Sequence, residues 1–204
     1  MSTRHLVGIS AGMGQPSATR LLTDRLLEAA SRALGERGVA AEASAVELRD
    51  HAHDITNALL TAVPTGGLRA LIDEVADADG LVVVSPIFNA SYSGLFKMFF
   101  DILEPDILAG KPVLVAATGG TPRHSLALEH ALRPMFSHLR AVTVPTAVYA
   151  ATEDWGAGGT GAEDLVHRIA RAGGELAELV AAREPARRFD PYAEPVPFER
   201  LLAG

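Results

Sequence analysis

Short apolar runs alternate along the chain with longer segments in which apolar residues recur every three or four positions. The short runs predict five β-strands, at residues 5–10, 39–47, 81–85, 112–118 and 141–149. The third run, LVVVS, is continuously apolar and rich in β-branched residues, which is typical of a strand buried on both faces of a parallel sheet. Pro145 lies within the last run, so we expect that strand to lie at an edge or to end there.

The longer segments predict helices. Leu22, Leu26 and Ala33 share one face of the first of them, and Gly38 follows its end. The predicted helices span residues 19–36, 68–78, 93–103, 125–138 and 162–183. Residues 49–67 are polar and irregular, which predicts a loop excursion between the second strand and the second helix.

Strands and helices that alternate in this way predict an α/β fold in which helices cover both faces of a parallel sheet. Right-handed crossovers leave few topologies. Five strands favour a flavodoxin-like three-layer sandwich with strand order 2-1-3-4-5 over the six-stranded dinucleotide-binding fold. We expect residues 1–184 to form this domain. We expect residues 185–204 to form an extended C-terminal tail, since the end of the chain is rich in proline.

Composition narrows the class of protein. The 204 residues are 48% hydrophobic and 21% charged, as in a soluble globular protein. The net charge of −7 and the lack of a basic cluster argue against nucleic acid as the main partner. The chain has no cysteine, which excludes disulfides, thiolate catalysis and cysteine-bound metal. No apolar stretch is long enough for a signal peptide or a membrane span, so we expect a cytoplasmic protein.

Open α/β sheets bind ligands beyond the carboxyl ends of their strands, which directs attention to three loops. The first loop, SAGMGQPSAT, follows the first strand and opens a helix. Its hydroxyls, its glycines and the free N–H groups of the helix start can hold a phosphate. The candidate residues are Ser10, Gly12, Ser17, Ala18 and Thr19. The plainer reading is a capped helix, because serine and threonine are common N-caps.

The second loop, SPIFNASYSG at residues 85–94, follows the buried third strand. Proline gives it a flat backbone that can lie along a planar ring, and the polar side chains can bond the edge of that ring. The candidate residues are Pro86, Ile87, Phe88, Asn89 and Ser91. The plainer reading is a turn in which Phe88 packs inward and Ser91 or Ser93 caps the next helix.

The third loop, ATGGTPRHS at residues 117–125, exposes the backbone N–H groups of two glycines after a buried strand. Such donors can stabilise a developing anion. The candidate residues are Thr118, Gly119, Gly120 and His124. The plainer reading of His124 is a surface residue without a role in binding. The histidines of the chain show no spacing typical of a metal site. Taken together, a phosphate at the first loop and a planar ring between the other two describe flavin mononucleotide.

The same segments carry a family resemblance. SAGMGQPSAT, SPIFNASYSGLFKMFFD and ATGGTPRHSLALEHALRP resemble the NADPH-dependent FMN reductase family. ATEDWG at 151–156 and the ending VPFERLLAG resemble in particular the actinobacterial members that partner luciferase-like flavin monooxygenases. The family's phosphate loop reads Gly-Ser-x-Arg-x-x-Ser. Ser10 and Ser17 match it, whereas Met13 or a small neighbour occupies the arginine position. The family's ring loop has tyrosine where this chain has Phe88, so a phenol donor is lost and the ring face is kept.

The resemblance implies an NAD(P)H:FMN oxidoreductase that transfers hydride to FMN and supplies reduced flavin to a flavin-dependent monooxygenase. It implies that the second loop lines the isoalloxazine ring and that the third approaches its pyrimidine edge. Hydride passes between the two cofactors, so neither a catalytic acid–base pair nor a metal is expected. The resemblance further implies a homodimer or homotetramer. The apolar run at 95–103 agrees, because it has more aromatic residues than one buried helix face needs.

Three other functions stay open at this point. A quinone or azo-dye reductase would share the ring site, and turnover with FMN against quinones would separate the two. A flavodoxin-type electron carrier would bind FMN without oxidising NADPH. A dinucleotide-dependent dehydrogenase would use Gly12 and Gly14, with Glu47 on the ribose, but its third glycine is replaced by Ser17. Release of FMN from the purified protein would exclude the dehydrogenase.

Overall fold

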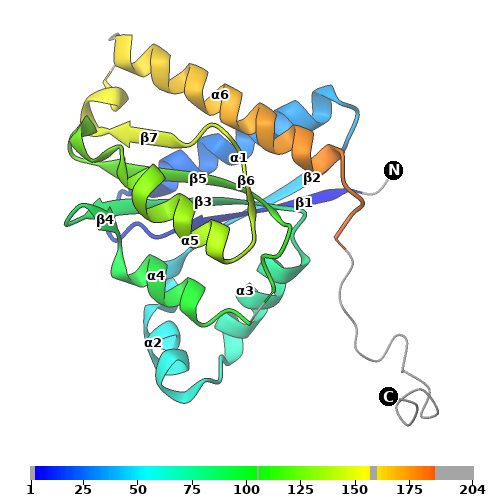
Figure 1. Ribbon diagram of the computed structural model, residues 1–204, viewed down its shortest axis with the longest axis vertical. Coiled ribbons are helices and arrows are strands. Elements are labelled where there is room, and N and C mark those ends of the chain that lie inside the picture. The colour runs from blue at the N-terminus through cyan, green and yellow to red at the C-terminus, as the bar shows by residue number, and fades with distance from the viewer. Residues whose placement is uncertain (1–2, 105, 157–159, 187–204) are drawn as a thin grey trace.

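The computed structural model describes residues 3–104, 106–156 and 160–186. Its central sheet contains four long parallel strands in the spatial order β2-β1-β3-β5 (Figure 1). Two shorter strands, β6 and β7, pair with the outer side of β5. The strands are β1 (Arg4–Ser10), β2 (Ala41–Glu47), β3 (Gly80–Phe88), β5 (Pro112–Gly119), β6 (Val142–Thr143) and β7 (Val148–Ala151). The flavodoxin-like α/β class predicted from the sequence is confirmed.

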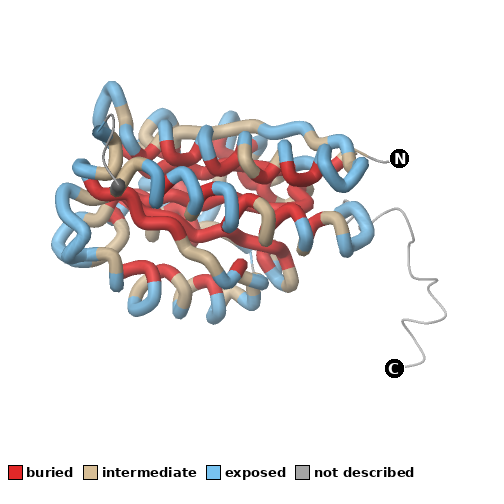
Figure 2. The backbone as a smooth tube through the Cα atoms, turned by 90° about the horizontal axis from the view of Figure 1, so that it is seen from above, coloured by how far each residue is buried: buried red, intermediate tan, exposed pale blue. Residues whose placement is uncertain are grey.

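Helices cover both faces of this sheet, which gives three layers. The helices are α1 (Ala18–Glu36), α2 (Ala52–Thr61), α3 (Gly66–Asp77), α4 (Gly94–Asp101), α5 (Arg133–His138) and α6 (Thr160–Ala181). α1 and α6 contribute to one buried apolar cluster, and α2 to α5 contribute to the cluster on the opposite face. Figure 2 shows buried strands between helices whose outer sides are exposed. Apolar burial on both faces of the strands explains the continuous run LVVVS.

The strand count differs from the five predicted. A two-residue strand, β4 (Ser91–Tyr92), folds back antiparallel on the end of β3. The expected last strand is divided into β6 and β7, with Pro145 between them. Because proline has no N–H, it cannot continue the hydrogen-bond ladder between strands. Side chains bond the backbone of the residues around Pro145 instead. Arg133 donates to the carbonyls of Val144 and Pro145, and Glu175 accepts from the Thr146 N–H at 2.7 Å.

The prediction of an irregular loop at residues 49–67 is wrong. A 3₁₀ turn at Leu48–His51 leads into α2. Ile55 and Ala58 are the buried residues of α2, while Leu60 is 81% exposed. Two inward-facing positions in ten residues are too few to stand out as a periodic pattern among the polar ones. Packing against the rest of the sandwich therefore determines this helix.

Two further segments differ from the prediction. Residues 125–138 do not form one helix, because a wide π-helical turn at Leu128–Leu132 precedes α5. The N–H of Arg133 donates to the carbonyl of Leu128, five residues earlier. In α4, Phe96, Phe99 and Phe100 are all buried, and Phe100 packs edge to face on Phe136. The core thus uses the aromatic residues of 95–103 that were expected to exceed its needs.

The described chain ends near the amino edge of the sheet, where the strands begin. The N–H of Ala186 donates to Asp79 at 2.7 Å, and Arg183 donates to the carbonyl of Gly110. Residues 187–204, which make up most of the predicted tail, lie outside the described residues. Among the residues described, no helix is long and apolar enough to cross a membrane.

Candidate functional site

The three predicted loops follow β1, β3 and β5, which are neighbours in the sheet, so their ends meet at its carboxyl edge. The registers bring Ser10 beside Val84 and Pro86 beside Thr118. A buried hydrogen bond of 2.9 Å joins the hydroxyls of Thr19 and Thr118, and so ties the first loop to the third. The topology therefore places all three loops around one region, as the rule for open α/β sheets requires.

The first loop holds a hydroxyl that the protein leaves unused. Ser10 is fully buried, and its Oγ has no hydrogen-bond partner. Ser17 is the N-cap of α1, where its Oγ accepts from the Arg20 N–H at 3.2 Å. A methyl group added at Gly12 would overlap that same Oγ, so a larger residue there would displace the Ser17 hydroxyl. Buried polar groups are nearly always bonded, which makes the Ser10 hydroxyl a candidate ligand contact.

Two arginines bear on the charge of this loop. Arg20, in the first turn of α1, is engaged with Asp24 at 2.8 Å. Arg49 follows β2, donates to the Gly14 carbonyl at 3.3 Å and pairs with Glu47 at 3.0 Å. The sequence pattern did not identify Arg49, which is 35 residues away from the loop that it contacts. No local pattern could have found it, because the contact depends on where the chain goes after β2.

The second loop is the hairpin that joins β3 to β4. Asn89 and Ala90 both have positive φ, at 48° and 69°, which is typical of a two-residue hairpin turn. The Ser85 hydroxyl accepts from the Ser93 N–H at 2.9 Å and holds the base of the hairpin. Ser93 caps α4, as the plainer reading expected, but Phe88 is 51% exposed and does not pack inward.

The third loop is held from below by a residue that the sequence pattern did not identify. Tyr149 in β7 donates its hydroxyl to the Thr121 carbonyl at 2.8 Å. That hydroxyl occupies the space a side chain on Gly119 would need, so the tyrosine and the glycine fit as a pair. Burial raises the pKa of Tyr149, and the Asp154 carboxylate adds to this. The phenol therefore stays protonated as a donor at neutral pH.

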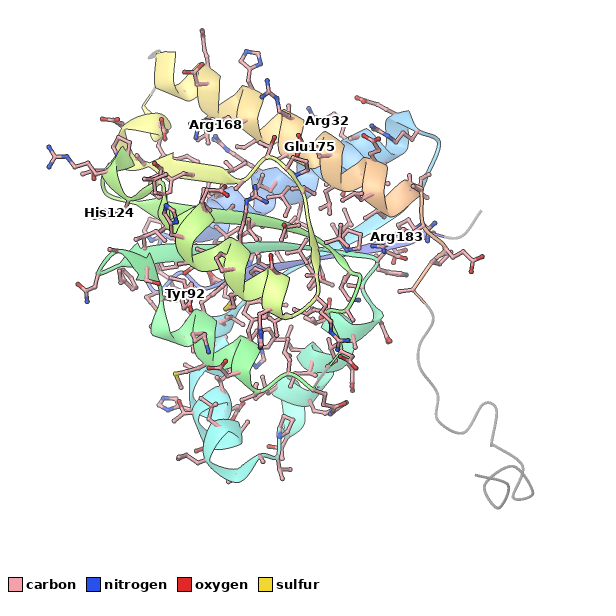
Figure 3. All side chains as sticks on the ribbon, in the orientation of Figure 1. Arg32, Tyr92, His124, Arg168, Glu175 and Arg183 are labelled. Carbon is pink, nitrogen blue, oxygen red and sulfur yellow. The ribbon has the colours of Figure 1, made fainter. Side chains whose placement is uncertain are left out.

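The predicted residues divide into buried and accessible groups. Ser10, Thr19, Pro86 and Thr118 are buried, whereas Phe88, Asn89, Gly120 and His124 are exposed. His124 and Ser91 border a hollow of about 400 Å³ between the hairpin and the start of the π-helical turn. His124 and Tyr92 lie at the same end of the molecule (Figure 3). Among the described residues, no group of three metal-binding side chains occurs.

The model of the NADPH-dependent FMN reductase family matches residues 5–156. An "FMN reductase (NADPH)" of Pseudomonas aeruginosa is 38% identical over 87% of this chain and 93% of its own length. An NADH-dependent FMN reductase of Pseudomonas fluorescens is also 38% identical, over 85% of this chain and 90% of its own.

Solved structures of similar fold include enzymes of the same kind as these two relatives. An oxidoreductase from Corynebacterium diphtheriae superposes with a TM-score of 0.86 at 48% identity, over 89% of this chain and 99% of its own. The apo form of an NADH:FMN oxidoreductase superposes with a TM-score of 0.70 at 30% identity, over 94% and 97%. An archaeal flavodoxin, at 13% identity and a TM-score of 0.54, shares the fold alone. The chain belongs to the NADPH-dependent FMN reductase family.

Proposed function

We propose that the three loops at the carboxyl edge bind FMN for reduction by NAD(P)H, the reaction of the family to which the chain belongs. The observation that carries this assignment is the buried, unpartnered hydroxyl of Ser10. Leaving such a group unbonded costs about 1–3 kcal/mol. A phosphate or hydroxyl oxygen of the bound nucleotide would give it a partner, so the residues present fit the cofactor.

The first loop is suited to the phosphate. α1 begins at Ala18, so its free N–H groups and the positive end of its dipole lie at this loop. Ser17 offers its hydroxyl proton, since its oxygen accepts only from the helix. We assign the missing cationic role of the family's loop arginine to Arg49, whose guanidinium contacts the loop at Gly14. Both arginines already bind a carboxylate, Arg49 that of Glu47 and Arg20 that of Asp24. We prefer Arg49 because its side chain also donates to the loop at Gly14.

The second and third loops are suited to the flavin ring. Phe88 offers an exposed aromatic face, and Gly119 and Gly120 offer backbone N–H groups beside Thr118. Donors placed there stabilise the negative charge that reduction brings to the pyrimidine edge. Bound FMN itself supplies the hydride-accepting chemistry. The chain has to position the ring and leave one of its faces open to the nicotinamide.

The test replaces Ser10 by alanine and measures the Kd for FMN by fluorescence quenching. We expect the Kd to rise about fivefold, which corresponds to about 1 kcal/mol for one hydrogen bond. Ser31 provides a matched control, because its Oγ is also buried and unpartnered but lies further along α1. Ser31→Ala should leave the Kd unchanged. Equal Kd values for the wild-type protein and both variants would contradict the assignment.

The assembly and the partner are further proposals. A homodimer or homotetramer that passes reduced FMN to a flavin-dependent monooxygenase in the cytoplasm is in keeping with the family resemblance. Leu59, Leu60 and Val63 at the end of α2 are exposed apolar side chains that suit a subunit contact. We also propose that residues 1–184 make up the FMN-binding domain. Sedimentation of the protein lacking residues 187–204 tests whether the tail supports the oligomer, and Ala186 is kept because Asp79 binds it.

A further inference from the structure

A basic hollow adjoins the proposed flavin site. It has a volume of about 400 Å³ and lies between the hairpin after β3 and the helical segment that follows β5. Arg123, His124 and His130 line it, together with Ser91 and the exposed side chain of Leu126. None of the lining residues is acidic, although the whole chain carries a net charge of −7. This local excess of positive charge indicates an anionic ligand.

The three basic side chains are free to bind such a ligand. Within the described residues, none of them makes an ion pair or a side-chain hydrogen bond. Other arginines of the chain are engaged, such as Arg69 with Asp73 and Arg133 with Glu129. The second pair matters here, because Arg133 binds the carboxylate next to His130 at 2.8 Å and holds it in an ion pair. The positive charge of the hollow is therefore not neutralised from within the protein.

The backbone brings these side chains together from two short elements. Arg123 and His124 belong to a 3₁₀ turn at Pro122–His124, and His130 lies in the π-helical turn at Leu128–Leu132. The hairpin turn closes the opposite side through Ala90 and Ser91. Since Ser91 and His124 are also predicted to border the flavin ring, the hollow continues the proposed ring site.

We propose that this hollow binds a phosphate group of the nicotinamide dinucleotide while its nicotinamide reaches the flavin. The inference rests on the proposed function, because it places the hydride donor beside the proposed flavin site. When the nicotinamide of a dinucleotide lies on the flavin ring, its phosphates must lie over a neighbouring surface of the protein. The hollow is such a surface, because it is basic and adjoins the proposed ring site. The relatives include enzymes named for NADPH and for NADH. Because both cofactors carry the same nicotinamide, the preference between them depends on residues that contact the rest of the dinucleotide.

The test uses Arg123→Gln, which removes a positive charge, and His130→Gln, which removes an imidazole, both at exposed positions. With FMN saturating, the KM for NADPH of Arg123→Gln should rise about tenfold and that of His130→Gln about threefold, with kcat nearly unchanged. The Kd for FMN should not change. Arg171→Gln is the matched control, since Arg171 is exposed on α6 and no side-chain partner is seen for it in the described structure. It should leave both constants unchanged.

The nucleotides separate the two sources of phosphate. A rise in KM for NADPH alone assigns the hollow to the 2′-phosphate, and an equal rise for NADH assigns it to the pyrophosphate. Unchanged KM values for both, or a tenfold rise in the Kd for FMN, would overturn the proposal. Calorimetry with adenosine 2′,5′-bisphosphate and with ADP gives a readout that does not depend on flavin. Binding that Arg123→Gln weakens would support the subsite even if FMN bound elsewhere, and no binding by the wild-type protein would oppose it.

Discussion

The amino and carboxyl edges of the sheet differ in whether their buried polar side chains have hydrogen-bond partners. At the amino edge, Asp79 accepts hydrogen bonds from Arg4 at 3.2 Å, from the His5 N–H at 2.8 Å and from the Ala186 N–H at 2.7 Å. At the carboxyl edge, the Ser10 hydroxyl is buried without a partner, and Arg123 and His124 stand free. Figure 3 shows Arg183 and His124 at these opposite ends. The bonds at the amino edge hold the end of the described chain, whereas the carboxyl edge also offers polar side chains that no described residue binds.

The largest expected effect is at the amino edge. Asp79→Asn should lower the free energy of unfolding by about 3–5 kcal/mol, because it leaves Arg4 as a buried charge without a counterion. Urea denaturation measures the change. Glu28→Gln, which breaks an exposed pair with Arg32, should cost less than about 1 kcal/mol. The folded fraction of the Asp79 variant should bind FMN normally, and a weakened affinity would contradict the separation of the two edges.

The next effect concerns the support of the third loop. Gly119→Ala should raise the Kd for FMN about tenfold and lower the free energy of unfolding by about 1–3 kcal/mol, because the added methyl group overlaps the Tyr149 hydroxyl. Gly120→Ala is the matched control for stability, since a methyl group there meets no protein atom within 4 Å. Adding Tyr149→Phe to the Gly119 variant should restore part of the affinity. Equal losses in the free energy of unfolding for the two alanine variants would refute this account.

A smaller effect appears in the pH dependence of stability. Lys111 donates to the carbonyls of Ala76 at 2.9 Å and Ala78 at 2.5 Å, at the end of α3. Burial lowers the pKa of Lys111 from its ordinary value of 10.5 to about 8 in the folded protein. The unfolded chain then binds more protons above about pH 8, so this group adds stability as pH rises, by about 1 kcal/mol between pH 7 and 9.

Replacing the lysine by methionine isolates that contribution. The difference in free energy of unfolding between Lys111→Met and the wild-type protein should change by about 1 kcal/mol over the same interval of pH. Urea denaturation at each pH measures it. A constant difference would mean that Lys111 keeps an ordinary pKa when folded.

The smallest effect has the opposite sign to the first. In the flavin-free protein, Ser10→Ala should leave the free energy of unfolding unchanged or raise it by up to about 1 kcal/mol, because it removes a buried hydroxyl that has no partner. Thermal unfolding without FMN, with Ser31→Ala alongside, measures it. A loss of more than about 1 kcal/mol would show that the protein itself bonds this hydroxyl.

Much of the fold, and the place of the proposed site within it, follow from local sequence patterns. The apolar runs predict the long strands because a strand buried on both faces must be apolar throughout. Once the strands are parallel, their carboxyl ends share one edge, and that brings the first, second and third loops together. The joint chemistry of the loops then indicates FMN, and the family match agrees. Each loop is recognised within a few residues, and the parallel order of the strands is enough to bring the three loops together.

Tertiary packing decided the rest. α2 depends on two inward residues whose burial only the folded chain provides, and Pro145 divides a strand because Arg133 and Glu175 are there to bond its flanks. Arg49 contacts the first loop from 35 residues away, and the Tyr149 hydroxyl fills the space that a side chain on Gly119 would need. Sequence periodicity records which face of an element is buried. It carries no information on which distant side chain will meet that face, and so the charge and support of the site appear only in the folded molecule.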